Sequence, residues 1–280
     1  MKGFKKLIIA LISLIIITDT AAIILNILLK NRILNPKYYL RVLETNGFYS
    51  YLENDIFNNL NNMLLKYNLG KDVYEKYIDK RMIEDNITRM VYCTVDYFLK
   101  VEDELPKPNL SLDVVIRREV EESLSRKGIL NNEKISEEIG KRVNETVEEK
   151  LMIKNLDRIE KNRNILLVRD IVSNIYKNLR QYIIVLLTSI SLLLLIAKAK
   201  GIRLISFILQ IMGFITTFFM FFILLTRYYY KTFIVDQFYK QILLNIVIGI
   251  VLYFANIGIV IFILGILLYF SYKYINKKEA

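Results

Sequence analysis

The residue with the clearest chemical potential is an aspartate inside an apolar run. Asp19 stands between Thr18 and Thr20, near the middle of a run that extends from Leu7 to Leu29. A carboxylate near the centre of a bilayer costs roughly 2.5 to 3.5 kcal/mol on insertion scales, so it should face a helix bundle, a water-filled cavity or a basic partner. The amide side chains in apolar segments that could meet it are Asn26, Gln210, Asn245 and Asn256.

These polar residues support two interpretations. Asp19 and the amides could line a path for protons or cations, which would make the chain a component of a channel or transporter. Alternatively, Asp19 is protonated or lies close enough to an interface to stay hydrated, and it only joins helices. Replacing Asp19 with asparagine separates the two interpretations. A channel or transporter component should change its ion or pH dependence, whereas a protein in which Asp19 only joins helices should keep its partner binding.

Composition excludes many other chemistries. The chain has no histidine and a single cysteine, Cys93. Histidine triads, imidazole zinc sites, histidine proton relays and intrachain disulfides are therefore impossible. The adjacent glutamates, such as Glu121 and Glu122, point about 100° apart on a helix and fit solvated faces. We expect no catalytic, metal or cofactor site, and no enzymatic activity.

Four apolar segments determine the predicted architecture. The first is Leu7 to Leu29, and three more lie between about Ile183 and Tyr269. A run of roughly 20 apolar residues is what a helix needs to cross a bilayer. The sequence therefore predicts an all-α membrane protein with four transmembrane helices and a large helical extracytoplasmic domain between helices 1 and 2. The expected parts are a signal-anchor helix at 1–30, the helical domain at 31–180, a three-helix membrane bundle at 181–272 and a basic cytoplasmic tail at 273–280.

Basic residues predict the orientation. They cluster before the first span, between the second and third, and after the last, and basic clusters of this kind mark the cytoplasmic side. The termini should then be cytoplasmic, and residues 31–180 and the loop from Arg227 to Lys240 should face outward across the plasma membrane. Cleavage near Ala21 is conceivable, but the apolar run continues past it and favours an uncleaved anchor. The clusters are Lys2, Lys5 and Lys6; Lys198, Lys200 and Arg203; and Lys273, Lys277 and Lys278.

The net charge of +11 does not indicate nucleic acid. Residues 31–180 are nearly balanced in charge, and the basic excess flanks the spans, where it meets anionic lipid headgroups. The expected partners are the lipid bilayer and either another protein or further copies of this chain.

Apolar residues at helical spacing predict the helices of the outer domain. Asn68 to Gly70 should end the first of them, Pro106 and Pro108 should divide the domain in two, and Gly128 should end another helix. Each helix carries a row of such apolar residues, called a stripe here. We predict that the stripes form the core of a helical bundle and not a groove that binds a partner. They are Leu52, Ile56, Leu60 and Leu64; Tyr74, Ile78, Ile83, Ile87, Val91 and Val95; Ile116, Val120 and Leu124; and Ile135, Ile139, Val143, Val147 and Leu151.

The segment from Lys141 to Lys200 contains neither proline nor glycine. A single helix over it would extend about 90 Å, although Asn155 and Asn162 to Asn164 could interrupt it. Leu167, Ile171, Ile175 and Leu179 form an apolar face that leads into the second span. Such a helix could transmit a change in the outer domain to the membrane bundle, or it could have no signalling role.

Small residues in the last apolar segment are Gly249, Ala255, Gly258 and Gly265. They could permit close approach of another helix, but they do not form a strict GxxxG motif and so carry no specific signal. The order of one span, a large outer domain and three clustered spans is similar to the layout of permease-like subunits of mechanotransmitting ABC systems. The turn from Lys198 to Arg203 is too short for the coupling helix of such subunits, so we assign no family.

Overall fold

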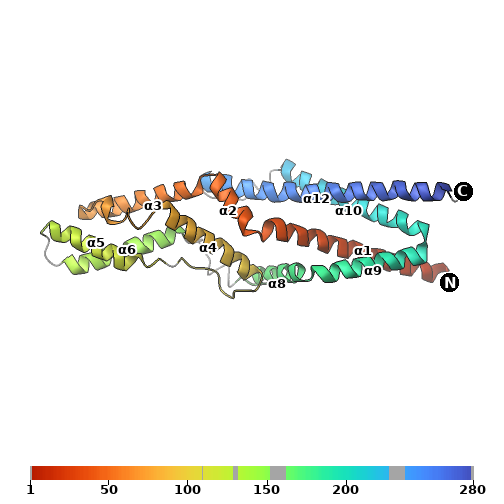
Figure 1. The fold of residues 1–280 in the computed structure, drawn as a ribbon, viewed down its shortest axis with the longest axis horizontal. Helices are drawn as coiled ribbons and strands as arrows, with labels where there is room; N and C mark the ends of the chain where they lie inside the picture. Colours follow the sequence, from red (N-terminus) through yellow and green to blue (C-terminus); the bar gives the residue numbers. More distant parts are fainter. Residues whose placement is uncertain (1, 109, 129–131, 152–161, 227–236, 279–280) are drawn as a thin grey trace. The chain divides into compact units, whose positions relative to one another are not determined.

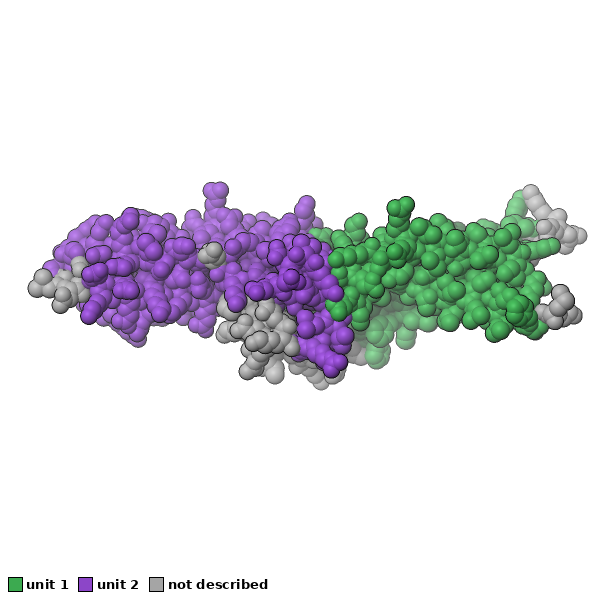
Figure 2. Space-filling model, turned by 90° about the horizontal axis from the view of Figure 1, so that it is seen from below, with its two compact units in different colours: residues 1–35, 170–280 green, residues 36–169 purple. Residues whose placement is uncertain are grey.

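The computed structural model describes residues 2–108, 110–128, 132–151, 162–226 and 237–278. This described part is built from helices and contains no strand, which confirms the predicted all-helical class. The chain divides into two compact units (Figure 2). Unit 1 comprises Met1–Asn35 and Asp170–Ala280, and unit 2 comprises Pro36–Arg169.

Unit 1 contains four helices that are long and apolar enough to cross a membrane (Figure 1). α1 covers Lys2–Leu28 and continues into a π-helical turn at Leu29–Ile33. The other three are α9 (Leu179–Ala197), α10 (Ala199–Thr226) and α12 (Gln237–Lys278). Their candidate spans are Gly3–Ile33, Leu179–Ala197, Ala199–Leu225 and Gln237–Ile275. The prediction of four spans is confirmed, and they indicate a membrane protein.

An apolar cluster joins α1, α9 and α10. Its buried members are Ile12 and Ile16 of α1, Leu193 of α9, and Ile205 and Ile208 of α10. Lys198 alone separates α9 from α10 and adopts a positive φ of 50°. The predicted short basic turn is therefore a single residue. The predicted loop from Arg227 to Lys240 lies mostly outside the described residues, as do Tyr228 to Tyr230.

Unit 2 is formed by α2 (Pro36–Thr45), α3 (Phe48–Leu64), α4 (Lys80–Phe98), α5 (Leu112–Arg126) and α6 (Asn132–Leu151). The predicted stripes are its core. Leu52, Ile56, Leu60 and Leu64 are at most 1% exposed, as are Ile116, Val120, Ile139, Val143 and Val147. Regular burial at four-residue spacing is what an amphipathic helix requires.

The predicted helix boundaries in unit 2 hold with one exception. Asn68 adopts the left-handed conformation after α3, and Gly128 does so after α5. Tyr74 and Ile78 are fully buried as predicted, but they do not belong to a helix that continues into α4. The carboxylate of Asp79 accepts a hydrogen bond from the backbone amide of Met82 at 2.7 Å, and this N-cap starts α4 at Lys80.

The segment from Lys141 to Lys200 is not one long helix. α6 ends at Leu151, and α8 covers Arg163–Lys177. Asn162 is not helical and directly precedes α8, and its side-chain oxygen accepts a hydrogen bond from the Asn164 amide at 2.9 Å. Asn155 lies outside the described residues. A further interruption at Asn178 separates α8 from α9, so the part of this segment from Arg163 to Ala197 is not a single helix either.

Candidate functional site

Asp19 is buried on α1. Its side chain is 9% exposed, and its Oδ2 atom has no hydrogen-bond partner among the described residues. Thr20 is buried beside it, at 7% exposed. Thr18 is exposed and donates its hydroxyl to the carbonyl oxygen of Ile15 at 2.9 Å. The carboxylate therefore faces packed helices, while the threonine before it is satisfied by its own helix.

Asn26 bonds to the end of α8 and not to Asp19. It is 1% exposed, and its Nδ2 donates to the carbonyl oxygens of Ile175 at 2.6 Å and Tyr176 at 3.1 Å. Carbonyls in the last turn of a helix have no partner within that helix, and here the turn precedes the break at Asn178. Asn26 therefore caps α8 from α1.

Gln210 joins α10 to α12. Its Nε2 donates to Ser206 Oγ and to the carbonyl oxygen of Gly265, both at 3.2 Å. Ser206 Oγ donates to the same Gly265 carbonyl at 2.8 Å and is 1% exposed. The Gln210 amide, the Ser206 hydroxyl and the Gly265 carbonyl thus form one hydrogen-bonded cluster inside the bundle. This cluster holds α10 and α12 in register.

Glycines bring the backbones of α10 and α12 close together. A β-carbon added to Gly258 would lie 2.5 Å from Thr217 Oγ1, and one added to Gly213 would lie 2.5 Å from the Phe262 amide nitrogen. One added to Gly265 would lie 2.8 Å from the Gln210 amide nitrogen. Real β-carbons are not found at such distances, so these positions require glycine.

Gly258 and Gly265 thus permit the close helix approach that the sequence left open, and the helix that they contact is α10. The signal that could have revealed the contact is a repeat of seven and not of four. Ser206 and Gly213 are seven residues apart in α10, and Gly258 and Gly265 are seven apart in α12. Two helices that each present a small residue every seven positions can approach closely along one seam.

Asn245 and Asn256 are both exposed on α12. Asn245 has an interaction within the structure, whereas the Asn256 side chain makes no hydrogen bond among the described residues. Asp19 Oδ2 is likewise bonded to none of the four candidate amides. The seven polar candidates thus separate into a buried carboxylate, one buried and one exposed threonine beside it, a helix cap, an interhelical bond and two surface amides.

Sequence reasoning missed a clamp around Arg169, in the first half of α8. The guanidinium is buried, at 9% exposed. Its Nε donates to the Tyr97 carbonyl and its Nη2 to the Glu102 carbonyl, both at 2.6 Å. The guanidinium carbon lies 4.1 Å from the centre of the Tyr97 ring, and Nη2 lies 3.5 Å from Asp103 Oδ1. Arg169 thus fastens α8 to the end of α4 and to the acidic segment before the prolines.

The clamp lies on the buried side of α8, while part of the predicted apolar face is exposed. Leu167 and Ile171, which belong to the predicted apolar face, are 52% and 58% exposed. Arg169 and Ser173 are the residues of α8 that are buried. The available signal was the arginine, followed by Asp170, within the mostly apolar sequence from Ile165 to Val172. A buried arginine requires hydrogen-bond acceptors around its guanidinium.

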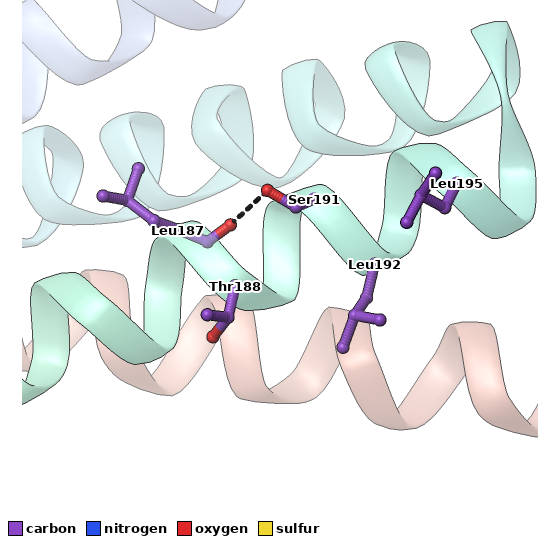
Figure 3. Close-up of a pocket in the computed structure, with 5 residues that line it drawn as sticks. All are labelled: Leu187, Thr188, Ser191, Leu192 and Leu195. Carbon is purple, nitrogen blue, oxygen red and sulfur yellow. Dashed lines mark hydrogen bonds between the residues drawn. The ribbon is translucent and has the colours of Figure 1, made fainter.

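One depression described in the structure is an open apolar surface of about 410 Å³ on α9 (Figure 3). Leu187, Thr188, Ser191, Leu192 and Leu195 line it, and all five belong to that one helix. Ser191 donates its hydroxyl to the Leu187 carbonyl at 2.9 Å, so no polar group is left for a ligand there. A surface with a single wall fits contact with lipid chains better than a binding chamber.

Titratable groups in unit 2 are perturbed by packing. Burial and the neighbouring Tyr38 raise the pKa of Tyr39 to about 12. The hydroxyl of Tyr77 donates to Glu119 at 2.6 Å, and this bond lowers the pKa of the carboxyl group.

No group of three or more acidic or cysteine side chains that could hold a metal occurs in the described part of the chain.

Comparison of this chain with models of protein families, with curated proteins and with solved structures finds no match. The features of the described residues that bear on function are the clamp at Arg169, the cap at Asn26 and the carboxylate at Asp19.

Proposed function

We propose that this chain is a non-enzymatic, multi-pass plasma-membrane protein whose helical domain faces outward and binds a protein partner or senses the cell envelope. In this proposal α8 passes the state of that domain to the membrane helices. The domain is unit 2 together with the chain that flanks it. The observation that carries the proposal is that α8 has a specific polar anchor for each unit.

The two anchors lie close together on one helix. Unit 2 ends at Arg169 and unit 1 resumes at Asp170, so the boundary falls within α8. Arg169 bonds to the end of α4, and the carbonyls of Ile175 and Tyr176 accept hydrogen bonds from Asn26 of α1. Two helical turns, about 10 Å, separate the anchors.

A short helix is a suitable element for this coupling. Each anchor is directional, and the arginine bonds are of the charge-assisted kind that are stronger than neutral ones. Moving the guanidinium would move the carbonyls that Asn26 caps, because the helical hydrogen bonds between them keep their spacing fixed. A partner that binds one arrangement of the domain more tightly than another would then favour one arrangement of the membrane helices.

α8 also offers a surface for a partner. Leu167, Val168 and Ile171 are 52%, 51% and 58% exposed, although all three are large and apolar. Adjacent exposed apolar residues next to a membrane span are typical of contact with another protein or with the headgroup region.

The test is to purify the tagged full-length protein from its native membrane in mild detergent after cross-linking, and to determine the composition of the complex. A stoichiometric second protein cross-linked to residues of unit 2 or α8 would support the proposal. A second protein cross-linked only through the spans would contradict it, and a chain that carries no other protein would contradict the partner-binding form of the proposal.

Orientation is tested separately with a Ser111→Cys variant in a Cys93→Ala background. Ser111 is exposed in unit 2, so an impermeant maleimide should label it on intact cells. Labelling that requires permeabilisation would place this unit in the cytoplasm and would contradict the outward assignment.

A second candidate function is favoured by Asp19. A buried carboxylate with an unpartnered oxygen would suit a homo-oligomeric channel or transporter component with Asp19 in its polar path. Reconstituted wild-type protein should then pass protons or cations, and Asp19→Asn should abolish or alter the pH dependence of that flux. Absence of flux from the wild-type protein would leave Asp19 with a structural role.

A further inference from the structure

Asn256 lies well inside the last span. It follows Lys240 by 16 residues and precedes Lys273 by 17, so it is about 25 Å along the helix from either basic residue. The carbonyl of the preceding residue, Ala255, accepts a hydrogen bond from Thr217 Oγ1 of α10 at 3.4 Å. Its backbone is thus part of the packed α10–α12 pair, while its side chain is exposed.

The exposed amide of Asn256 makes no hydrogen bond among the described residues, in contrast to four exposed hydroxyls of the spans. The hydroxyls of Thr18, Thr188, Ser191 and Ser271 each donate to a carbonyl of their own helix, three or four residues earlier. An amide left without partners in hydrocarbon costs several kcal/mol, so a partner from outside the chain is expected.

The surroundings of Asn256 form a helix-packing face. Leu252, Ile259 and Ile263 lie four residues before it, three after it and seven after it, and they are 48%, 44% and 49% exposed. Alternating steps of four and three residues produce the stripe of a left-handed helix pair. This stripe lies on the side of α12 opposite Gly258 and Gly265, which α10 already covers.

We propose that a second copy of this chain packs on this stripe, with the two Asn256 amides bonded to each other across a twofold axis. A carboxamide has both a donor and an acceptor, so an identical group satisfies it reciprocally. Twofold packing brings the same residue of each copy to the axis, and the apolar residues on either side meet their own counterparts. The interface does not depend on what unit 2 binds or on a role for Asp19.

Disulfide cross-linking of the full chain in lipid bilayers tests this interface. In a Cys93→Ala background, Ile263→Cys should form a disulfide-linked dimer on mild oxidation. Leu264→Cys is the matched control, because Leu264 is also 49% exposed but points about 100° away around the helix. Equal cross-linking at both positions, or none at Ile263→Cys, would overturn the proposal.

The amide is tested by measuring dimerisation in bilayers with fluorescently labelled protein over a range of protein-to-lipid ratios. Asn256→Leu should raise the dimer dissociation constant about tenfold, as expected for loss of interhelical hydrogen bonds. Asn256→Gln keeps an amide and should restore most of the affinity. A wild-type chain that stays monomeric at every ratio, or a dimer unaffected by Asn256→Leu, would contradict the assignment. Cross-linking to a different protein at Ile263→Cys would also do so.

Discussion

Unit 2 and the α10–α12 pair of unit 1 are packed by different residues. In unit 2 the contacts are made by leucine, isoleucine and valine at four-residue spacing, and these side chains are almost completely buried. In α10 and α12 the large apolar side chains point outward, with Phe214, Phe218 and Phe222 each more than half exposed, and the helices meet through glycine and serine. Water drives burial of apolar surface in the first case, whereas lipid provides no such drive in the second.

The largest effect should come from deleting a core side chain of unit 2. Leu64 is fully buried and Leu65, the next residue, is 66% exposed. Leu64→Ala should lower the free energy of unfolding of unit 2 by about 2 to 5 kcal/mol, because it leaves a cavity. Leu65→Ala should change it by less than about 0.5 kcal/mol. Hydrogen exchange of unit 2 peptides in lipid nanodiscs measures both, and similar losses would remove the basis of the comparison.

The corresponding change in unit 1 adds a side chain. Gly258→Ala places a β-carbon against Thr217 of α10 and should destabilise the bundle by about 1 to 3 kcal/mol through overpacking. Gly3→Ala is the control, since nothing lies within 4 Å of a β-carbon there. Loss of helical circular dichroism with increasing SDS in mixed micelles provides the measurement. A Gly258→Ala protein as stable as the wild type would show that the two helices are not in close contact.

A polar contact between helices should have a smaller effect. Asn26→Leu leaves the carbonyls of Ile175 and Tyr176 without their donor and should destabilise the junction of α8 and α9 by about 1 to 2 kcal/mol. Asn31→Leu is matched, because Asn31 is exposed and donates only to the Ile27 carbonyl of its own helix. Amides from Asn174 to Tyr182 should exchange faster in the first variant and at the wild-type rate in the second. An unchanged rate in both would argue against the cap.

The smallest effect is a pH dependence in unit 2. The bond from Tyr77 lowers the pKa of Glu119 below its ordinary value of 4.5 in the folded protein. The stabilisation is therefore present above that pH and is lost as the pH falls through the folded-state pKa. Tyr77→Phe should unfold slightly more easily than the wild type at pH 7, and the difference should vanish in acid. Tyr92→Phe, on the exposed surface of α4, should show no such trend in the same denaturation series.

The contrast between the units also explains what the sequence could and could not predict. The stripes from Leu52 to Leu64 and from Ile116 to Leu124 were readable because polar residues separate them. In α10 and α12 nearly every residue is apolar, so hydrophobic periodicity carries no information about which face is packed. The small residues of this contact are seven residues apart in each helix. They therefore match a seven-residue repeat and not the four-residue spacing of GxxxG.

The clamp and the cap could not be predicted because each joins residues that are far apart in the chain. Arg169 bonds to Tyr97 and Asn26 bonds to Ile175, and in both bonds the acceptor is a backbone carbonyl. A backbone carbonyl is present at every residue, so no pattern of side chains identifies the one that is used. Asn26 is one of four amides that the sequence offers as possible partners of Asp19, and its actual partner depends on where α8 ends.

The most direct test of the account is whether loosening the clamp at Arg169 reaches the membrane helices. Hydrogen exchange should be compared in nanodiscs for the wild type, for Arg169→Gln, and for Arg142→Gln, which alters an exposed ion pair with Glu138. Coupling through α8 predicts that Arg169→Gln speeds exchange about tenfold both at 97–105 and at the start of α9, while Arg142→Gln changes neither. Faster exchange confined to 97–105 and the first half of α8 would contradict the proposed coupling.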